Sequence, residues 1–306
     1  MMRTARRRFS VVLIAALATG GALLGAAPAA SAATIISVGS NFPTNVTVGQ
    51  TNVAASLTII NSSTPPDAAS NVTVTAITLV PSCGTQVIGA DCPAASTDPG
   101  VFQLSPTAVG EAGTACAGIT FAITLIDPVQ GRYSFIPSSP VILGPTGTST
   151  SVCIIDFLVN VLRAPTKDAS PAAPGLQTSQ LAFAASGNIS SGSAASLVTV
   201  NPAATSLTTQ VAPAAITVGA FFNDTATLTR PAGGPVPTGT VTFAVFGPGN
   251  PTCTGVPVFT STNPLNAAGT TAVSTNFTPT LAGTYRVVAT YSGDANYLSS
   301  ASACGD

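Results

Sequence analysis

The chain reads Thr238-Gly239-Thr240-Val241-Thr242-Phe243 at the start of its last third, with apolar residues alternating with threonine after the glycine. A period of two places one row of side chains on each face of a β-strand. Similar alternation occurs at 55–59, 71–80 and 285–289, while the chain has only one Lys and one Glu. These patterns predict an all-β protein in which sheets pack face to face to bury their apolar sides.

Sequence length and composition predict two β-sandwich domains. After removal of an N-terminal leader, roughly 274 residues would remain, which exceeds one sandwich of about 100 residues. A Ser- and Gly-rich connector at 186–204 separates two strand-rich regions. We therefore place the first domain, whose role the sequence does not define, at residues 33–200 and the second at 206–306.

The second region contains further motifs. They are Gly247-Pro248-Gly249-Asn250-Pro251-Thr252-Cys253, Ala282-Gly283-Thr284-Tyr285, Ser292-Gly293-Asp294-Ala295-Asn296-Tyr297 and the final Cys304-Gly305-Asp306. Together with the 238–243 run, they resemble the bacterial immunoglobulin-like (Ig-like) repeats of actinobacterial cell-surface and exported proteins. The resemblance covers roughly residues 206–306. It implies an Ig-like sandwich and brings no particular activity with it.

Residues 1–32 have the order of a secretory signal peptide. A basic segment with Arg3 and Arg6–Arg8 precedes the apolar run 11–30, and Ala30-Ser31-Ala32 offers small residues for cleavage. Glycines and a proline dilute the run, which favours a cleaved signal over a membrane anchor. We expect cleavage after Ala32, no transmembrane segment afterwards, and a secreted or extracellular protein that is either released or held at the cell surface.

The mature chain would carry five basic residues against ten acidic ones, a net charge of −5. It therefore lacks the basic patch that nucleic-acid binding requires. Charged residues make up only 6% of the chain, so Thr, Ser, Asn, Gly and apolar atoms must form most of its exterior. Such a surface suits neutral partners: a glycan, another cell-envelope component, a protein, or a second copy of the chain.

Six cysteines in an exported chain favour three disulfides, although six cysteines allow fifteen pairings. Cys83 with Cys92 would close a short loop, and this loop would either present a recognition surface or keep itself from fraying. Cys116 with Cys153 would join two strand-like runs, and Cys253 with Cys304 would lie within the Ig-like repeat. Each pair is expected to add about 2–4 kcal/mol of stability.

Few residues offer chemistry. The chain has no histidine, which excludes Ser-His-Asp and Cys-His catalysis, and Glu111 is its only glutamate, in a flexible Gly-rich loop. We predict no enzyme activity, no cofactor and no metal. Tyr285 resembles the tyrosine corner of Ig-like folds, and Asp294 with Asn296 is typical of a hairpin turn more than of a calcium site.

These observations predict a secreted, non-enzymatic surface protein whose Ig-like modules act in adhesion or as spacers. The alternative is a soluble extracellular binder of a neutral glycan or a small apolar ligand. A third reading is that the chain is the front of a longer protein.

Overall fold

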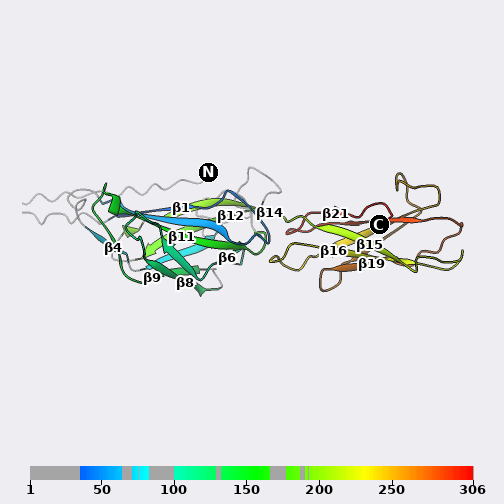
Figure 1. The fold of residues 1–306 in the computed structure, drawn as a ribbon, viewed down its shortest axis with the longest axis horizontal. Coiled ribbons are helices and arrows are strands. Elements are labelled where there is room, and N and C mark those ends of the chain that lie inside the picture. The colour runs from blue at the N-terminus through cyan, green and yellow to red at the C-terminus, as the bar shows by residue number, and fades with distance from the viewer. Residues whose placement is uncertain are drawn as a thin grey trace, which may run out of the picture. The chain divides into compact units, whose positions relative to one another are not determined.

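The computed structural model describes residues 35–63, 71–74, 76–82, 100–128, 132–165, 177–186, 190–191 and 193–305 (Figure 1). The expected signal peptide and the Cys83–Cys92 loop lie outside the described residues. The described part is made of β-strands with one turn of 3-10 helix at Ser149–Ser151, so the predicted all-β class is confirmed. Within it, no helix is long and apolar enough to cross a bilayer.

The described residues of the first β region form fourteen strands. They are β1 (Ile35–Asn41), β2 (Asn45–Thr47), β3 (Val53–Asn61), β4 (Val72–Val74), β5 (Ala76–Ser82), β6 (Phe102–Leu104), β7 (Thr107–Gly110), β8 (Thr120–Asp127), β9 (Arg132–Pro137), β10 (Val141–Leu143), β11 (Val152–Val161), β12 (Gln177–Ser186), β13 (Ser190–Ser191) and β14 (Ser193–Asn201). Twelve of them share one sheet in the order β13-β1-β3-β11-β7-β8-β9-β5-β12-β14-β2, with β6 also paired to β11. Strands β4 and β10 form a separate pair.

The twelve-stranded path returns to its starting strand. Ile36 of β1 faces Asn61 of β3 in an antiparallel pair and Ser191 of β13 in a parallel pair. A few residues later, β2 pairs in parallel with β14, the strand that follows β13. Strand β1 therefore has hydrogen-bonded neighbours on both sides at Ile36, and β13 and β14 bring the two ends of the sheet together.

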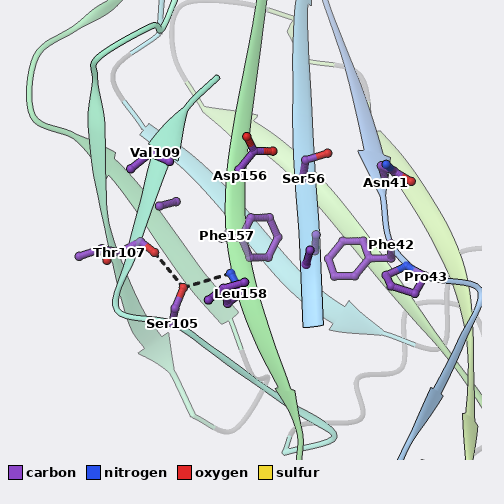
Figure 2. A pocket seen from close by; sticks show the side chains of 13 residues that line it. Asn41, Phe42, Pro43, Ser56, Ser105, Thr107, Val109, Asp156, Phe157 and Leu158 are labelled. Carbon is purple, nitrogen blue, oxygen red and sulfur yellow. Dashed lines mark hydrogen bonds between the residues drawn. The ribbon is translucent and has the colours of Figure 1, made fainter. Parts of the chain in front are cut away.

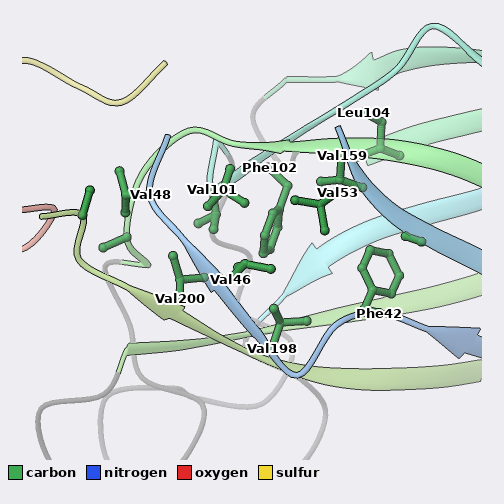
Figure 3. Close-up of a cluster of buried hydrophobic side chains, with 14 of the residues drawn as sticks. Phe42, Val46, Val48, Val53, Val101, Phe102, Leu104, Val159, Val198 and Val200 are labelled. Carbon is green, nitrogen blue, oxygen red and sulfur yellow. The ribbon is translucent and has the colours of Figure 1, made fainter. Parts of the chain in front are cut away.

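Alternation along β3 and β11 fills this core. In β3, Val53, Ala55, Leu57 and Ile59 are buried, and the residues between them point outward. Strand β11 repeats this pattern over ten residues. Figure 3 shows one end of the core, where side chains from β2, β3, β6, β11 and β14 meet. The alternation decides which side chains of each strand point outward. Because β3 and β11 are paired neighbours, their outward side chains share one surface.

The second β region is a two-sheet sandwich, as the resemblance implies. One sheet has the order β15 (Ser206–Ala212), β16 (Asn223–Thr229), β19 (Thr271–Val273). The other has the order β18 (Phe259–Pro264), β17 (Thr240–Phe246), β20 (Arg286–Tyr291), β21 (Ser300–Ala301). The alternating 240–243 run is the first half of β17, where Val241 and Phe243 are fully buried.

Two tyrosines are fully buried in this sandwich, and each hydroxyl has a backbone acceptor. Tyr291 donates to the carbonyl of Thr238 at 2.7 Å, and Tyr297 donates to the carbonyl of Pro235 at 2.7 Å. Burial of a phenol is stabilising only when its hydroxyl finds such a partner. The two bonds tie the segment before β17 to the end of the domain's second sheet.

Candidate functional site

A groove of about 590 Å³ lies on the outer face of the first β region (Figure 2). It is formed by the end of β1, the middle of β3 and β11, and the segment 105–109 that includes most of β7. We call it the β3–β11 groove. Its volume falls in the range of small-molecule sites, which is about 300–1,000 Å³.

Three polar side chains and one valine form a row across the groove. Asn41 of β1 faces Ser56 of β3, Ser56 faces Asp156 of β11, and Asp156 faces Val109 of β7. Figure 2 shows these four residues side by side on neighbouring strands. Adjacent strands lie about 4.8 Å apart, so the amide, hydroxyl and carboxylate span about 10 Å. Within the described residues, Asp156 has no ion-pair partner.

An irregularity in the strand pairing shapes the wall beside this row. Strands β6 and β7 both pair with β11, but the chain between them holds extra residues. Ser105 fills the gap: its N–H donates to the carbonyl of Leu158 at 2.8 Å, and its Oγ accepts from the Leu158 N–H at 3.3 Å. The same Oγ donates to the carbonyl of Thr107 at 2.8 Å. A bulge of this kind bends the strand and redirects its side chains.

Aromatic rings of the core pack below the floor of the groove. Phe42 and Phe157 are buried and meet edge to face with ring centroids 5.7 Å apart, and Phe135 contacts Phe157 from deeper in the core at 5.2 Å. Above them, the exposed Ala54 leaves space because its side chain is small. The groove thus lies directly above packed side chains of the core.

A second hollow, of about 540 Å³, lies in the second region between residues 211–218 and the corner 279–285. Tyr285 stands beside it and donates its hydroxyl to the carbonyl of Leu281 at 3.1 Å. Its ring contacts Phe277 and Phe222, with centroids 5.5 and 6.4 Å away. The predicted tyrosine corner is therefore confirmed, and this tyrosine serves the packing of the sandwich.

Asp294 organises a turn, as its neighbouring residues predict. One carboxylate oxygen accepts from the N–H and the hydroxyl of Thr238, at 2.8 and 2.9 Å. The other accepts from the N–H groups of Asn296 and Tyr297, at 2.8 and 3.0 Å. Both oxygens are thus used within the turn and by the neighbouring segment, as in ordinary Asx turns.

We expect Asp294→Ala to destabilise the second region by about 1–3 kcal/mol, because four hydrogen bonds to one carboxylate are lost. Urea denaturation followed by tyrosine fluorescence measures this change. Asp156→Ala removes an exposed carboxylate of the first region and serves as the control. Equal stability of the two variants would contradict the structural role of Asp294.

The structure joins Cys116 to Cys153 and Cys253 to Cys304, two of the three expected pairs. The first links the loop between β7 and β8 to β11, and both of its residues are fully buried. The second links the 247–258 turn to the segment after β21, where Cys304 is exposed. Cys83 and Cys92 lie outside the described residues. Neither described pair borders the β3–β11 groove.

The groove residues were not identified from the sequence. Asn41, Ser56 and Asp156 are far apart in the chain and belong to no motif. Each is an outward residue of an alternating strand, and only the register of β1, β3 and β11 brings them together. Glu111, which the sequence analysis considered, is exposed in a loop and outside the groove, in keeping with a solvated turn.

One buried acid stands apart from both hollows. Asp224 of β16 is 1% exposed, and neither of its carboxylate oxygens has a hydrogen-bond partner among the described residues. Burial raises the pKa of Asp224 to about 6, and the nearby backbone amides of Thr225 and Gln210 offset only part of this rise. No sequence pattern indicates this burial, because Asn223-Asp224-Thr225 looks like an ordinary polar strand start.

Comparison with solved structures shows only distant similarity. An adhesin of Yersinia pseudotuberculosis, InvE, aligns with 12% identity and a TM-score of 0.30 over 88% of this chain and 58% of that one. The major pilin SpaD of Corynebacterium diphtheriae aligns with 8% identity and a TM-score of 0.29 over 85% of this chain and 57% of that one. The C-terminal domain of the BspA polypeptide of Streptococcus agalactiae aligns with 7% identity and a TM-score of 0.29 over 87% of this chain and 99% of that one. This chain therefore spans little more than half the length of the first two proteins. TM-scores this low carry no argument about arrangement or role. Comparison with curated proteins gave no match.

Comparison with family models agrees with the sandwich and its tyrosine corner. The bacterial Ig-like domain of group 3 matches residues 207–304, which include all strands from β16 to β21 and nearly all of β15. The resemblance drawn from the 238–243 run and the later motifs is thereby confirmed. The C-terminal region of this chain is a bacterial Ig-like domain of group 3.

Proposed function

We propose that this protein is an extracellular, non-enzymatic component of a bacterial surface, in which the Ig-like domain and the first β region act as adhesive or spacer modules. The observation that carries this proposal is the bacterial Ig-like domain with its own disulfide, Cys253–Cys304. Disulfides persist in oxidising compartments outside the cytoplasm, so the bond supports export. The predicted signal peptide at residues 1–32 supports the same location.

Fractionation of a producing culture tests this proposal. We expect the chain in the medium or the cell wall, cut after Ala32, with a mass about six units lower than after reduction if all three pairs are oxidised. A variant without residues 2–32 is the control, and it should remain in the cytoplasm with reduced cysteines. Recovery of the intact chain in the cytoplasm would overturn the proposal.

The non-enzymatic part needs its own test. Purified mature protein should release no sugar from bacterial envelope or plant polysaccharide beyond a mock purification from cells that lack the gene. Hydrolysis that copurifies with the protein would contradict this part of the proposal and leave the location untouched.

Binding of a neutral ligand is the second candidate function. The β3–β11 groove favours it, because the groove has the volume and the mixed polar and apolar lining of a ligand site.

A further inference from the structure

The β3–β11 groove combines a polar row with apolar walls. Asn41, Ser56 and Asp156 supply an amide, a hydroxyl and a carboxylate at successive strands. Leu158 and Val109 are 42% and 53% exposed, although they are large apolar residues on a packed sheet. Pro43 and Ala54 complete the apolar surface around the row. A ligand that fits must satisfy hydrogen bonds along one side and offer apolar surface on the other.

The chemistry of the row excludes several ligand classes. Asp156 repels phosphates and carboxylates, and the described residues that line the groove include no Lys or Arg to offset this charge. A single carboxylate is too little for calcium, which takes six to eight oxygens. A purely apolar ligand would remove water from three polar groups and give them no partner, which costs free energy.

A neutral polyhydroxyl ligand meets every requirement. Its hydroxyl groups donate to the Asp156 carboxylate, which only accepts, and they both donate to and accept from the Asn41 amide and the Ser56 hydroxyl. A pyranose ring also has an apolar C–H face that can contact Leu158 and Pro43. The low charge of the whole chain fits a neutral partner as well.

We propose that the β3–β11 groove binds a neutral pyranose unit of a glycan, with Asn41, Ser56 and Asp156 hydrogen-bonded to its hydroxyls. This proposal names a ligand class for the proposed adhesive role. It depends on that role only for where the glycan comes from. Binding by purified protein and location in the culture are measured separately. Failure of one therefore does not imply failure of the other.

The test uses purified mature protein, residues 33–306, with mannotriose, maltotriose and galactotriose as probes and choline as a cationic control. Saturation-transfer NMR detects binding, and titration gives the dissociation constant. We expect at least one trisaccharide to bind and choline not to bind. Asp156→Ala should weaken that binding about tenfold or more, because the hydrogen bond to a charged acceptor is lost.

Two further variants make the outcome decisive. Ala54→Trp places a large side chain in the groove from an exposed position and should abolish binding without unfolding the sheet. Glu111→Ala removes the same charge from an exposed loop outside the groove and should leave binding unchanged. Thermal melts identify any variant that fails to fold. If Asp156→Ala fails to fold, Ala54→Trp still tests whether the groove is the binding site.

Three outcomes would overturn the proposal. The first is that none of the trisaccharides binds. The second is that one binds equally well to wild type and to folded Ala54→Trp protein, which would place the site elsewhere. The third is that choline alone binds and loses affinity in Asp156→Ala, which would make the groove a site for organic cations.

Discussion

Replacing Asp224 by Asn is expected to stabilise the Ig-like domain by up to about 3 kcal/mol at pH 8 and to leave its stability almost unchanged at pH 4. The reason is the environment of the carboxylate. Asp224 is 1% exposed, neither oxygen has a hydrogen-bond partner in the described part of the chain, and burial raises its pKa to about 6 from an ordinary value of 3.8. Asparagine has nearly the same shape as a protonated aspartate and carries no charge.

The direction with pH follows from proton binding in the two states. Below pH 3.8, Asp224 is protonated in both the folded and the unfolded chain, and the folded state loses nothing to its burial. Between this value and about 6, the unfolded chain releases the proton while the folded chain keeps it. Stability therefore falls as pH rises through this window and levels off above it, where the folded state holds a buried charge.

Urea denaturation of wild type and Asp224→Asn at intervals from pH 4 to pH 8 measures this difference. Other acids titrate equally in both proteins, so the difference between the two free energies of unfolding isolates Asp224. Glu111→Gln, which replaces an exposed acid of the first region, serves as the control for the substitution itself. A constant difference between wild type and Asp224→Asn at every pH would show that Asp224 does not titrate between 4 and 6.

Much of the fold could be predicted from local sequence. The alternation at 240–243 and 285–289 specified strands β17 and β20, because a period of two fixes which side chains are buried. Tyr285 was placed at its corner because it follows Gly283 by two residues, where a strand of the Ig-like fold is expected to begin, and its hydroxyl bonds to the nearby carbonyl of Leu281. Asp294 was assigned to a turn because Gly293 and Asn296 stand beside it at the spacing of a hairpin turn, and its carboxylate accepts from the Asn296 N–H. Each of these features depends on residues that are close in the chain.

The return of the first sheet to β1 could not be predicted in this way. It depends on parallel pairs between Ile36 and Ser191 and between Val46 and Val200, which are far apart in sequence. The same limit hid the β3–β11 groove, whose polar row exists only through the registers of three strands. Alternation indicates that Ser56 points outward, but it does not indicate which residues stand beside it.

The last prediction compares the two described disulfides. By loop length alone, reducing the Cys253–Cys304 pair should cost slightly more, because its residues are 51 apart and those of Cys116–Cys153 are 37 apart. Burial predicts the opposite order. Cys116 and Cys153 are both fully buried, so replacing them by alanine also leaves a void in the core, whereas Cys304 is exposed.

We therefore expect Cys116→Ala with Cys153→Ala to destabilise the first region by about 4–5 kcal/mol, and Cys253→Ala with Cys304→Ala to destabilise the Ig-like domain by about 3–4 kcal/mol. Hydrogen exchange measured by mass spectrometry assigns each loss to its own strands, with β11 and β20 as reporters. If the buried pair proved the less costly one, loop closure would outweigh packing at these bonds. Neighbouring side chains would then have to move into the void left near β11. Hydrogen exchange of the β11 amides would in that case be slower than a loss of about 4–5 kcal/mol requires.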